Sequence, residues 1–265
     1  MNHHLRWPIA AAALVVGVAA VAQHLQIFAG TASTEVSSEE VQQRYNAATS
    51  ATTDTATSAP NSADPTPVPG VYVYRTTGRD SVDALQGAHH DYPATTTITI
   101  TPTACGVTER WDVLDQRWEE WHRCATDGGI SETARTSHDE FFGQSQTDAW
   151  TCVGASRPIA AAGSTGATWA TTCTSGTTVE VHDGVVIGAD TIEVGTVAVA
   201  TLHVRVTISD ATASDTQTID TWYLQDSDLV VAQTAASATT NSSPIGDVHY
   251  VEAYEIRLTS LTPLT

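Results

Sequence analysis

Alternation of apolar and polar residues with a period of two is the dominant pattern of the chain from Gly70 onward. Between Ala198 and Ile208 the even-numbered residues are apolar, and the odd-numbered residues from Thr201 on are polar. Because successive side chains of a strand point to opposite faces, this alternation predicts a half-buried strand. Similar patterns predict strands at Gly70–Thr76, Thr95–Pro102, Val107–Leu114, Arg117–Cys124, Thr177–Val181, Thr216–Leu224, Leu229–Ala235 and Val248–Leu261.

Turn-forming residues separate these segments. Gly128-Gly129, Asp183-Gly184 and the run Ser243 to Gly246 are typical of turns. No long segment of this region has helical periodicity. Residues 70–265 are therefore predicted to form a single all-β, antiparallel domain, which is either a curved half-barrel or barrel-like sheet or, as the alternative, a sandwich.

The N-terminus follows a different pattern. Residues 7–28 are uncharged and largely apolar, and Arg6 precedes them. As a helix this segment would be about 31–33 Å long, enough to span a bilayer, whereas its densest part, Pro8 to Ala22, has the length of a signal-peptide core. The prediction is a cytoplasmic stub at 1–6 and either a transmembrane anchor or a cleaved signal at 7–28. The domain then lies outside the cytoplasm, at the cell membrane or secreted.

Residues 29–69 are expected to connect this segment to the domain. Ser37 and Glu40 form a capping-box pattern, which predicts a short juxtamembrane helix ending near Asn46. From Ala47 to Pro69 the chain is rich in Thr, Ser, Ala and Pro and has no apolar periodicity. Such a segment buries too little surface to offset the entropy of ordering, which predicts a disordered stalk.

Composition excludes several partners. The formal net charge is −19, and all eleven basic residues are arginines, a bias typical of genes with high G+C content. A domain this acidic repels phosphate backbones, so a nucleic-acid partner is excluded. It is also expected to resist self-association and to be a monomer. The expected partners are the membrane, through the N-terminal helix, and a lipid or an envelope protein.

Four cysteines in an exported chain indicate two disulfides. Their spacing matches no zinc motif, so neither a metal nor a cofactor is expected. Three pairings are possible, and we favour Cys105–Cys124 with Cys152–Cys173. The first pairing suits a hairpin in which Cys105 lies opposite Cys124, because this register sets Trp111 against Trp118.

No catalytic motif is recognisable, and the chain is expected not to be an enzyme. It has no Gly-x-Ser-x-Gly and no cysteine left for a thiolate. His89-His90-Asp91 and His138-Asp139-Glu140 are interpreted as polar loops. A less favoured hydrolase hypothesis requires a cleft in which at least two members of one set converge. That set is His89, His90, His138, Glu120 and Glu252.

Glu252 breaks the pattern of the last strand. Val248, Tyr250 and Tyr254 are among the apolar residues on the face that Glu252 shares. A carboxylate in such a setting needs an arginine or a tyrosine hydroxyl as a partner. The candidate ligand-binding residues are therefore Glu252, Tyr250, Tyr254 and Trp222.

The segment from Glu193 to Ala235 resembles the LolA-like lipoprotein-carrier superfamily and related actinobacterial surface proteins. The likeness lies in the alternating strand followed by Asp220-Thr221-Trp222-Tyr223-Leu224 and Asp228-Leu229-Val230-Val231, although Asp228 replaces the glycine of the family pattern and Val230 its proline. The resemblance implies an exported antiparallel half-barrel that holds an acyl chain and has no catalytic residues.

The leading hypothesis is thus a non-enzymatic cell-envelope protein that binds a lipid or another apolar ligand. Small alanines on the face of residues 198–208 would leave room for that ligand. The alternative is a protein-interaction or structural module of the envelope.

Overall fold

The computed structural model describes residues 33–50, 66–83, 87–159, 164–210, 216–225, 227–243 and 246–264. No helix in this part of the chain has the length and apolar character that crossing a bilayer requires. The anchor or signal expected at 7–28 and residues 51–65 of the expected stalk lie outside the described residues.

One helix, α1 (Ser38–Ser50), precedes the strands. Ser37 is its N-cap as predicted, since the Ser37 hydroxyl accepts a hydrogen bond from the Glu40 amide at 3.2 Å. The helix runs past the expected end at Asn46, because the hydroxyls of Thr49 and Ser50 bond carbonyls of the preceding turn. Residues 47–50, expected in the stalk, are therefore helical.

The remaining elements are all strands. They are β1 (Gly70–Val82), β2 (Ala88–Asp91), β3 (Thr95–Pro102), β4 (Gly106–Leu114), β5 (Arg117–Thr126), β6 (Gly129–Phe141), β7 (Gln144–Gly154), β8 (Arg157–Pro158), β9 (Thr168–Ser175), β10 (Thr178–Val194), β11 (Val197–Asp210), β12 (Thr216–Leu224), β13 (Val230–Ser243) and β14 (Gly246–Leu258).

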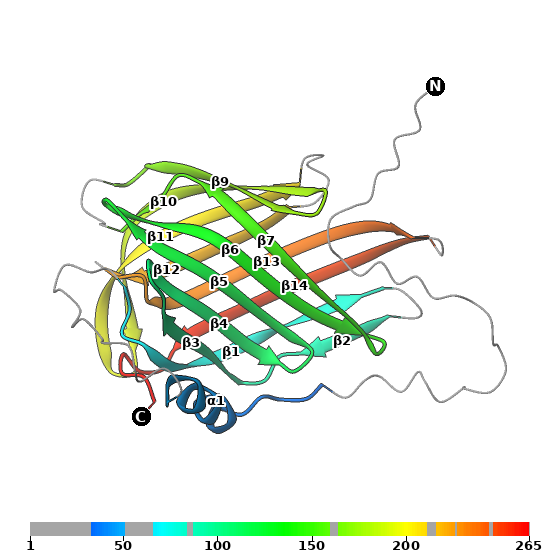
Figure 1. The fold of residues 1–265 in the computed structure, drawn as a ribbon, viewed down its shortest axis with the longest axis horizontal. Coiled ribbons are helices and arrows are strands. Elements are labelled where there is room, and N and C mark those ends of the chain that lie inside the picture. The colour runs from blue at the N-terminus through cyan, green and yellow to red at the C-terminus, as the bar shows by residue number, and fades with distance from the viewer. Residues whose placement is uncertain are drawn as a thin grey trace.

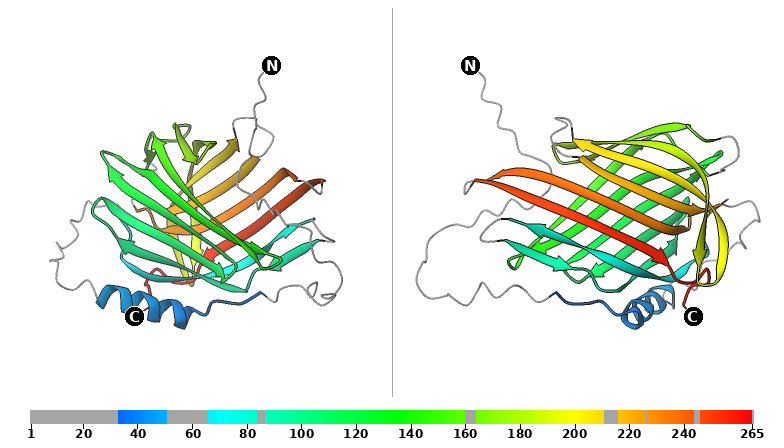
Figure 2. Two further views of the ribbon diagram at one scale, coloured as in Figure 1. Left: turned by 45° about the vertical axis from the view of Figure 1, so that its right-hand side comes forward. Right: turned by 180° about the vertical axis from the view of Figure 1, so that it is seen from behind.

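Twelve of these strands form a closed antiparallel barrel. Each pairs with the next along the order β1-β3-β4-β5-β6-β7-β9-β10-β11-β12-β13-β14, and β14 pairs back with β1. Figures 1 and 2 show the inclined strands of the barrel and α1 outside its wall, below β1 and β3. The prediction of an all-β antiparallel domain is confirmed. Closure settles the choice among half-barrel, barrel and sandwich in favour of the barrel, in which each of the twelve strands has a neighbour on both sides.

Several strands are missing from the sequence-based assignment. The segments that form β2, β6, β7, β8 and β9 lack continuous apolar alternation, because polar and charged side chains occupy many of their inward positions. Asp183-Gly184 is not a turn but lies within β10, where Gly184 is opposite Trp169. A Cβ at Gly184 would lie 2.1 Å from the Trp169 ring, so the glycine makes room for the indole.

The register of β4 and β5 differs by one residue from the predicted hairpin. Gly106 lies opposite Cys124, and Trp111 lies opposite Glu119. A shift of one residue moves side chains to the other face of a sheet. Trp111 is consequently buried inside the barrel, whereas Trp118 stacks on His138. The disulfide Cys105–Cys124 still forms, as does Cys152–Cys173, so both predicted pairings are confirmed.

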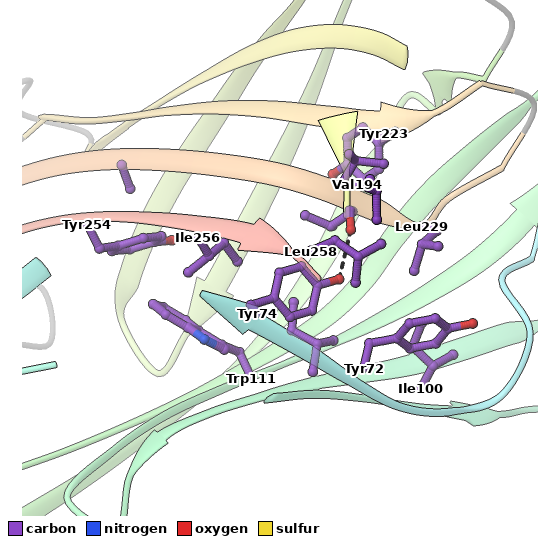
Figure 3. Close-up of a cluster of buried hydrophobic side chains, with 14 of the residues drawn as sticks. Tyr72, Tyr74, Ile100, Trp111, Val194, Tyr223, Leu229, Tyr254, Ile256 and Leu258 are labelled. Carbon is purple, nitrogen blue, oxygen red and sulfur yellow. Dashed lines mark hydrogen bonds between the residues drawn. The ribbon is translucent and has the colours of Figure 1, made fainter. Parts of the chain in front are cut away.

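One end of the barrel interior is filled by apolar side chains. Figure 3 shows Tyr74, Trp111 and Leu258 among the residues that converge there. The Tyr74 hydroxyl donates a hydrogen bond to the Val230 carbonyl at 2.7 Å, which satisfies the polar atom of this buried ring. Arg157 of β8 caps this end and lies 3.7 Å from the centre of the Tyr223 ring.

The alanines of β11 do not leave room inside the barrel. Ala198 and Ala200 are exposed, whereas Val199, Leu202 and Val204 are buried. These alanines, which suggested space for an apolar ligand, therefore face solvent.

Candidate functional site

The opposite end of the barrel contains a cavity of about 140 Å³. Its walls are the inward side chains near the ends of strands from β5 to β7 and from β10 to β14. This position follows from the alternation of the strands, because inward residues at one end of every strand must meet around one space. The charged side chains that line it are Arg117, Glu119, Arg135, Asp139, Asp148, Glu180, Asp210 and Glu252.

Arg117 is the centre of one group of charges. The side chains of Arg117 and Glu252 are both only 3% exposed, and an Arg117 Nη atom lies 3.1 Å from Glu252 Oε1. The same guanidinium contacts Glu119 at 2.5 Å and Asp139 at 3.3 Å. The Tyr92 hydroxyl also donates a hydrogen bond to Glu252. Glu252 thus has both kinds of partner that the sequence called for, an arginine and a tyrosine hydroxyl.

One guanidinium cannot neutralise three carboxylates. Burial raises the pKa of Glu252 to about 7, although Arg117 acts in the opposite direction. Burial likewise raises the pKa of Asp139 to about 6, again against the effect of Arg117. Near neutral pH these carboxyls can therefore both accept and donate hydrogen bonds.

Arg135 is the centre of a second group. Arg135 Nη2 lies 2.5 Å from Glu180 Oε2, and His182 Nε2 lies 3.3 Å from the same oxygen. Burial alone would raise the pKa of Glu180, but Arg135 and His182 together lower it. Glu180 is therefore a carboxylate, held by two neighbours at the cavity wall.

Aromatic rings complete the wall. Phe141 and Tyr250 contact each other edge to face, with ring centres 6.2 Å apart. Trp150 of β7 lies directly opposite Arg135 of β6, whose guanidinium is 5.2 Å from the indole centre. The cavity thus combines flat apolar faces with charged hydrogen-bonding groups.

Three buried polar atoms in this wall have no partner among the described residues. They are the indole nitrogen of Trp150, Nε of Arg135 and the hydroxyl of Thr239. The first two are donors, and the hydroxyl both donates and accepts. Asp139 Oδ1 also has no hydrogen bond, but it is paired with Arg117 Nε at 3.3 Å. A buried polar group without a partner costs about 1–3 kcal/mol, so these atoms favour a ligand that supplies the missing bonds.

Among the four candidate ligand-binding residues, two line this cavity. Glu252 and Tyr250 are in its wall. Tyr254 is deeper, in the apolar core, and its hydroxyl bonds Gln233. Trp222 is stacked on His203 and donates a hydrogen bond to Asp190, away from the cavity.

The histidine runs are strands, not loops. His89 and His90 belong to β2, with His89 exposed and His90 buried at 2.9 Å from Asp80. His138 lies in β6 and stacks on Trp118. Glu120 contacts His122 at 3.3 Å.

The hydrolase hypothesis named five residues. Among the described residues that line the cavity, Glu252 is present and the other four are not. The convergence that the hydrolase hypothesis required is therefore not found.

Sequence reasoning missed most of the site. Arg135 and Trp150 fall in segments that had no clear alternation, and Asp139 falls in a run interpreted as a loop. Glu180 falls in the predicted strand Thr177–Val181, but nothing in that segment singled it out. A usable signal was the period of two in charged residues. Arg117 and Glu119 are two residues apart on β5 and so share a face, and Asp139 of β6 lies directly opposite Arg117. A possible metal-binding group lies elsewhere, at Glu132, Cys152 and Cys173, whose cysteines form a disulfide.

The fold is a β-barrel, which is compatible with a binding module or a structural module. Comparison of the chain with protein-family models, with curated proteins and with solved structures finds no match for it.

Proposed function

We propose that this protein is a non-enzymatic, extracytoplasmic binding protein whose open barrel end holds a small, neutral, hydroxyl-rich ligand of about monosaccharide size. The observation that carries the proposal is the set of unpartnered polar atoms in one cavity wall, namely Trp150 Nε1, Arg135 Nε and Thr239 Oγ1. A hydroxyl group donates and accepts at once, so it can satisfy atoms of both kinds. The two disulfides support a location outside the cytoplasm.

Charge supports a neutral ligand over an anion. Six carboxylic acids and two arginines are among the described residues of the wall. An anionic ligand would therefore be repelled, whereas hydroxyl groups can bond both carboxylates and guanidinium groups. The rings of Trp150, Phe141 and Tyr250 offer flat faces for the C–H side of a sugar ring.

An acyl chain receives less support from this interior. The apolar half of the barrel is occupied by side chains such as Tyr74 and Trp111, both fully buried. The remaining space is lined by charged groups as well as by aromatic and aliphatic side chains, and desolvating the charged groups against a methylene chain would be unfavourable. We therefore favour a polar ligand over the lipid suggested by the family resemblance.

Titration of the full-length protein with a panel of probes tests the proposal. The panel contains neutral hexoses and pentoses, the corresponding amino sugars and sugar acids, and palmitate, with calorimetry as the readout. We expect saturable binding of at least one neutral sugar. Trp150→Phe and Thr239→Val should each weaken it about 2–10-fold, because each variant loses one hydrogen bond to the ligand.

Trp222→Phe is the matched control, because its indole lies away from the cavity and should leave binding unchanged. Binding of palmitate alone would overturn the proposal in favour of a lipid carrier. The absence of any binding would overturn it in favour of a structural module. Cleavage of a glycoside probe, abolished by Glu252→Gln, would show instead a hydrolase.

A further inference from the structure

Four side chains of types that bind transition metals lie close together in the barrel wall, separate from the ion pairs around Arg117. Cys152 of β7 lies directly opposite Cys173 of β9, and their sulfurs form a disulfide. His182 comes from β10 and Glu132 from β6. In Figure 1 these four strands run side by side, in the order β6, β7, β9, β10.

The distances among their ligand atoms are close to those of a zinc site. Glu132 Oε1 lies 3.6 Å from the Cys152 sulfur, 3.9 Å from the Cys173 sulfur and 3.9 Å from His182 Nδ1. The Cys173 sulfur is also 3.9 Å from His182 Nδ1. In tetrahedral zinc sites, bond lengths of about 2.0–2.3 Å put neighbouring ligand atoms about 3.3–3.8 Å apart.

The histidine is also oriented as a ligand requires. Its Nε2 lies 3.3 Å from Glu180 Oε2, and Arg135 Nη2 contacts the same oxygen at 2.5 Å. Histidines that bind zinc commonly donate the second ring nitrogen to a carboxylate, which fixes the tautomer and leaves the first nitrogen free to bind. Here that leaves Nδ1 of His182 directed toward Glu132 and the sulfurs.

We propose that reduction of the Cys152–Cys173 disulfide opens a Zn²⁺ site whose four ligands are Cys152, Cys173, His182 and Glu132. A dithiol reductant supplies two electrons and two protons, so that the disulfide becomes two thiols and the dithiol becomes a disulfide. Zn²⁺ then displaces the two thiol protons and binds both thiolates. Thiolate and imidazole ligands favour zinc over magnesium or calcium.

A linear motif could not reveal this site. The ligands are spread over residues 132 to 182 and come from four separate strands. Only the pairing of β6, β7, β9 and β10 brings them together.

The experiment uses the full-length wild-type chain, reduced with a phosphine and then loaded with Co²⁺ or Zn²⁺. We expect one equivalent of Co²⁺ with the thiolate charge-transfer absorption of a tetrahedral site, and none in the oxidised protein. Zn²⁺ should protect Cys152 and Cys173 from alkylation, whereas Cys105 and Cys124 are modified, as peptide mass spectrometry will show. Cys105 and Cys124 thus act as an internal control.

Substitutions distinguish Zn²⁺ binding at this four-ligand site from Zn²⁺ binding by the two cysteines alone. His182→Ala and Glu132→Gln remove ligands and should each weaken Zn²⁺ binding at least about tenfold, and Glu180→Gln about 10–100-fold through the orientation of His182. His122→Ala is the matched control, because this histidine bonds Thr108 and should not affect binding.

Four outcomes would overturn the proposal. The reduced protein could take up no metal, or its affinity could be unchanged by both His182→Ala and Glu132→Gln. Equal protection of all four cysteines would also overturn it. Circular dichroism checks that the reduced protein keeps its strands. If the strands are lost on reduction and adding metal does not restore them, the proposal is likewise overturned.

Discussion

At the scale of single residues, the buried ion pairs decide how the open end of the barrel is built. Arg117 lies among Glu119, Asp139 and Glu252, all on inward positions. A buried charge is tolerated only when paired, so these side chains fix one another in place. The sequence signalled this through Glu252, a carboxylate on an apolar face, but it could not name Arg117 as the partner.

Replacement of Arg117 by methionine should lower the free energy of unfolding by about 3–5 kcal/mol, because it leaves buried carboxylates without their cation. Urea unfolding of the full-length protein at pH 7 measures this. The control is Arg205→Met, whose pair with Asp220 is 48% exposed on the arginine side and should contribute at most about 1 kcal/mol. An equal loss of unfolding free energy in the two variants would contradict the assignment of Arg117 as the cation that pairs with these buried carboxylates.

At the scale of elements, register determines which side chains face inward. The predicted pairing of Cys105 with Cys124 placed Trp111 and Trp118 on one face, whereas the observed register separates them. The disulfide is consistent with both registers, so it could not distinguish them. The choice follows from burial of Trp111, whose indole nitrogen bonds Thr96 at 2.9 Å on β3.

The docking of α1 can be tested without unfolding the barrel. Val41 is buried beside Val36 and Val71, the last of which belongs to β1. Val41→Asp removes this apolar contact, worth about 1.5–3 kcal/mol, and should speed trypsin cleavage at Arg44 about tenfold or more. Mass spectrometry of a digestion time course provides the rate.

Gln43→Asp is the matched control for this prediction, because Gln43 is exposed on the same helix. The melting temperature of the barrel should change by only a few degrees in either variant. An unchanged cleavage rate in Val41→Asp would mean that α1 is held by other contacts.

At the scale of the whole molecule, closure of the barrel makes charges from distant parts of the chain share one interior. Glu109 lies 2.6 Å from Arg123 toward the apolar end, and Glu252 lies near the cavity. Burial raises the pKa of each to about 7, against the effects of Arg123 and Arg117 respectively. The folded protein therefore binds more protons than the unfolded chain over an intermediate range of pH.

The sign of the resulting pH dependence follows from linkage. Both glutamates titrate near 4.5 when unfolded and near 7 when folded, so their contribution to stability is complete below about pH 4.5 and is lost as the pH rises through 7. The urea midpoint should consequently be higher at pH 5 than at pH 8. Glu180, whose pKa is lowered, acts in the opposite direction at the acid end.

Urea unfolding at several values between pH 5 and pH 8 measures this dependence. The variant Glu109→Gln/Glu252→Gln should reduce it, because neither side chain then titrates. Asp139, whose pKa burial raises to about 6, keeps a smaller dependence between pH 5 and pH 6. A wild-type midpoint that is constant or rises toward pH 8 would contradict the prediction.

The sequence by itself determined the all-β class, many of the strands, the N-cap of α1, the presence of two disulfides and the acidic character of the molecule. These depend on local alternation, on capping chemistry and on cysteine number, each of which is encoded within a short segment. The requirement that Glu252 have a partner was local in the same sense.

Only the tertiary structure decided that β1 and β14 close the barrel, that Arg117 meets Glu252, and that Glu132 and His182 flank a disulfide. Each of these depends on how strands distant in the chain pair and in which register. A strand's own sequence sets its two faces, but the pairing minimises the free energy of the whole sheet, and no short segment encodes that choice.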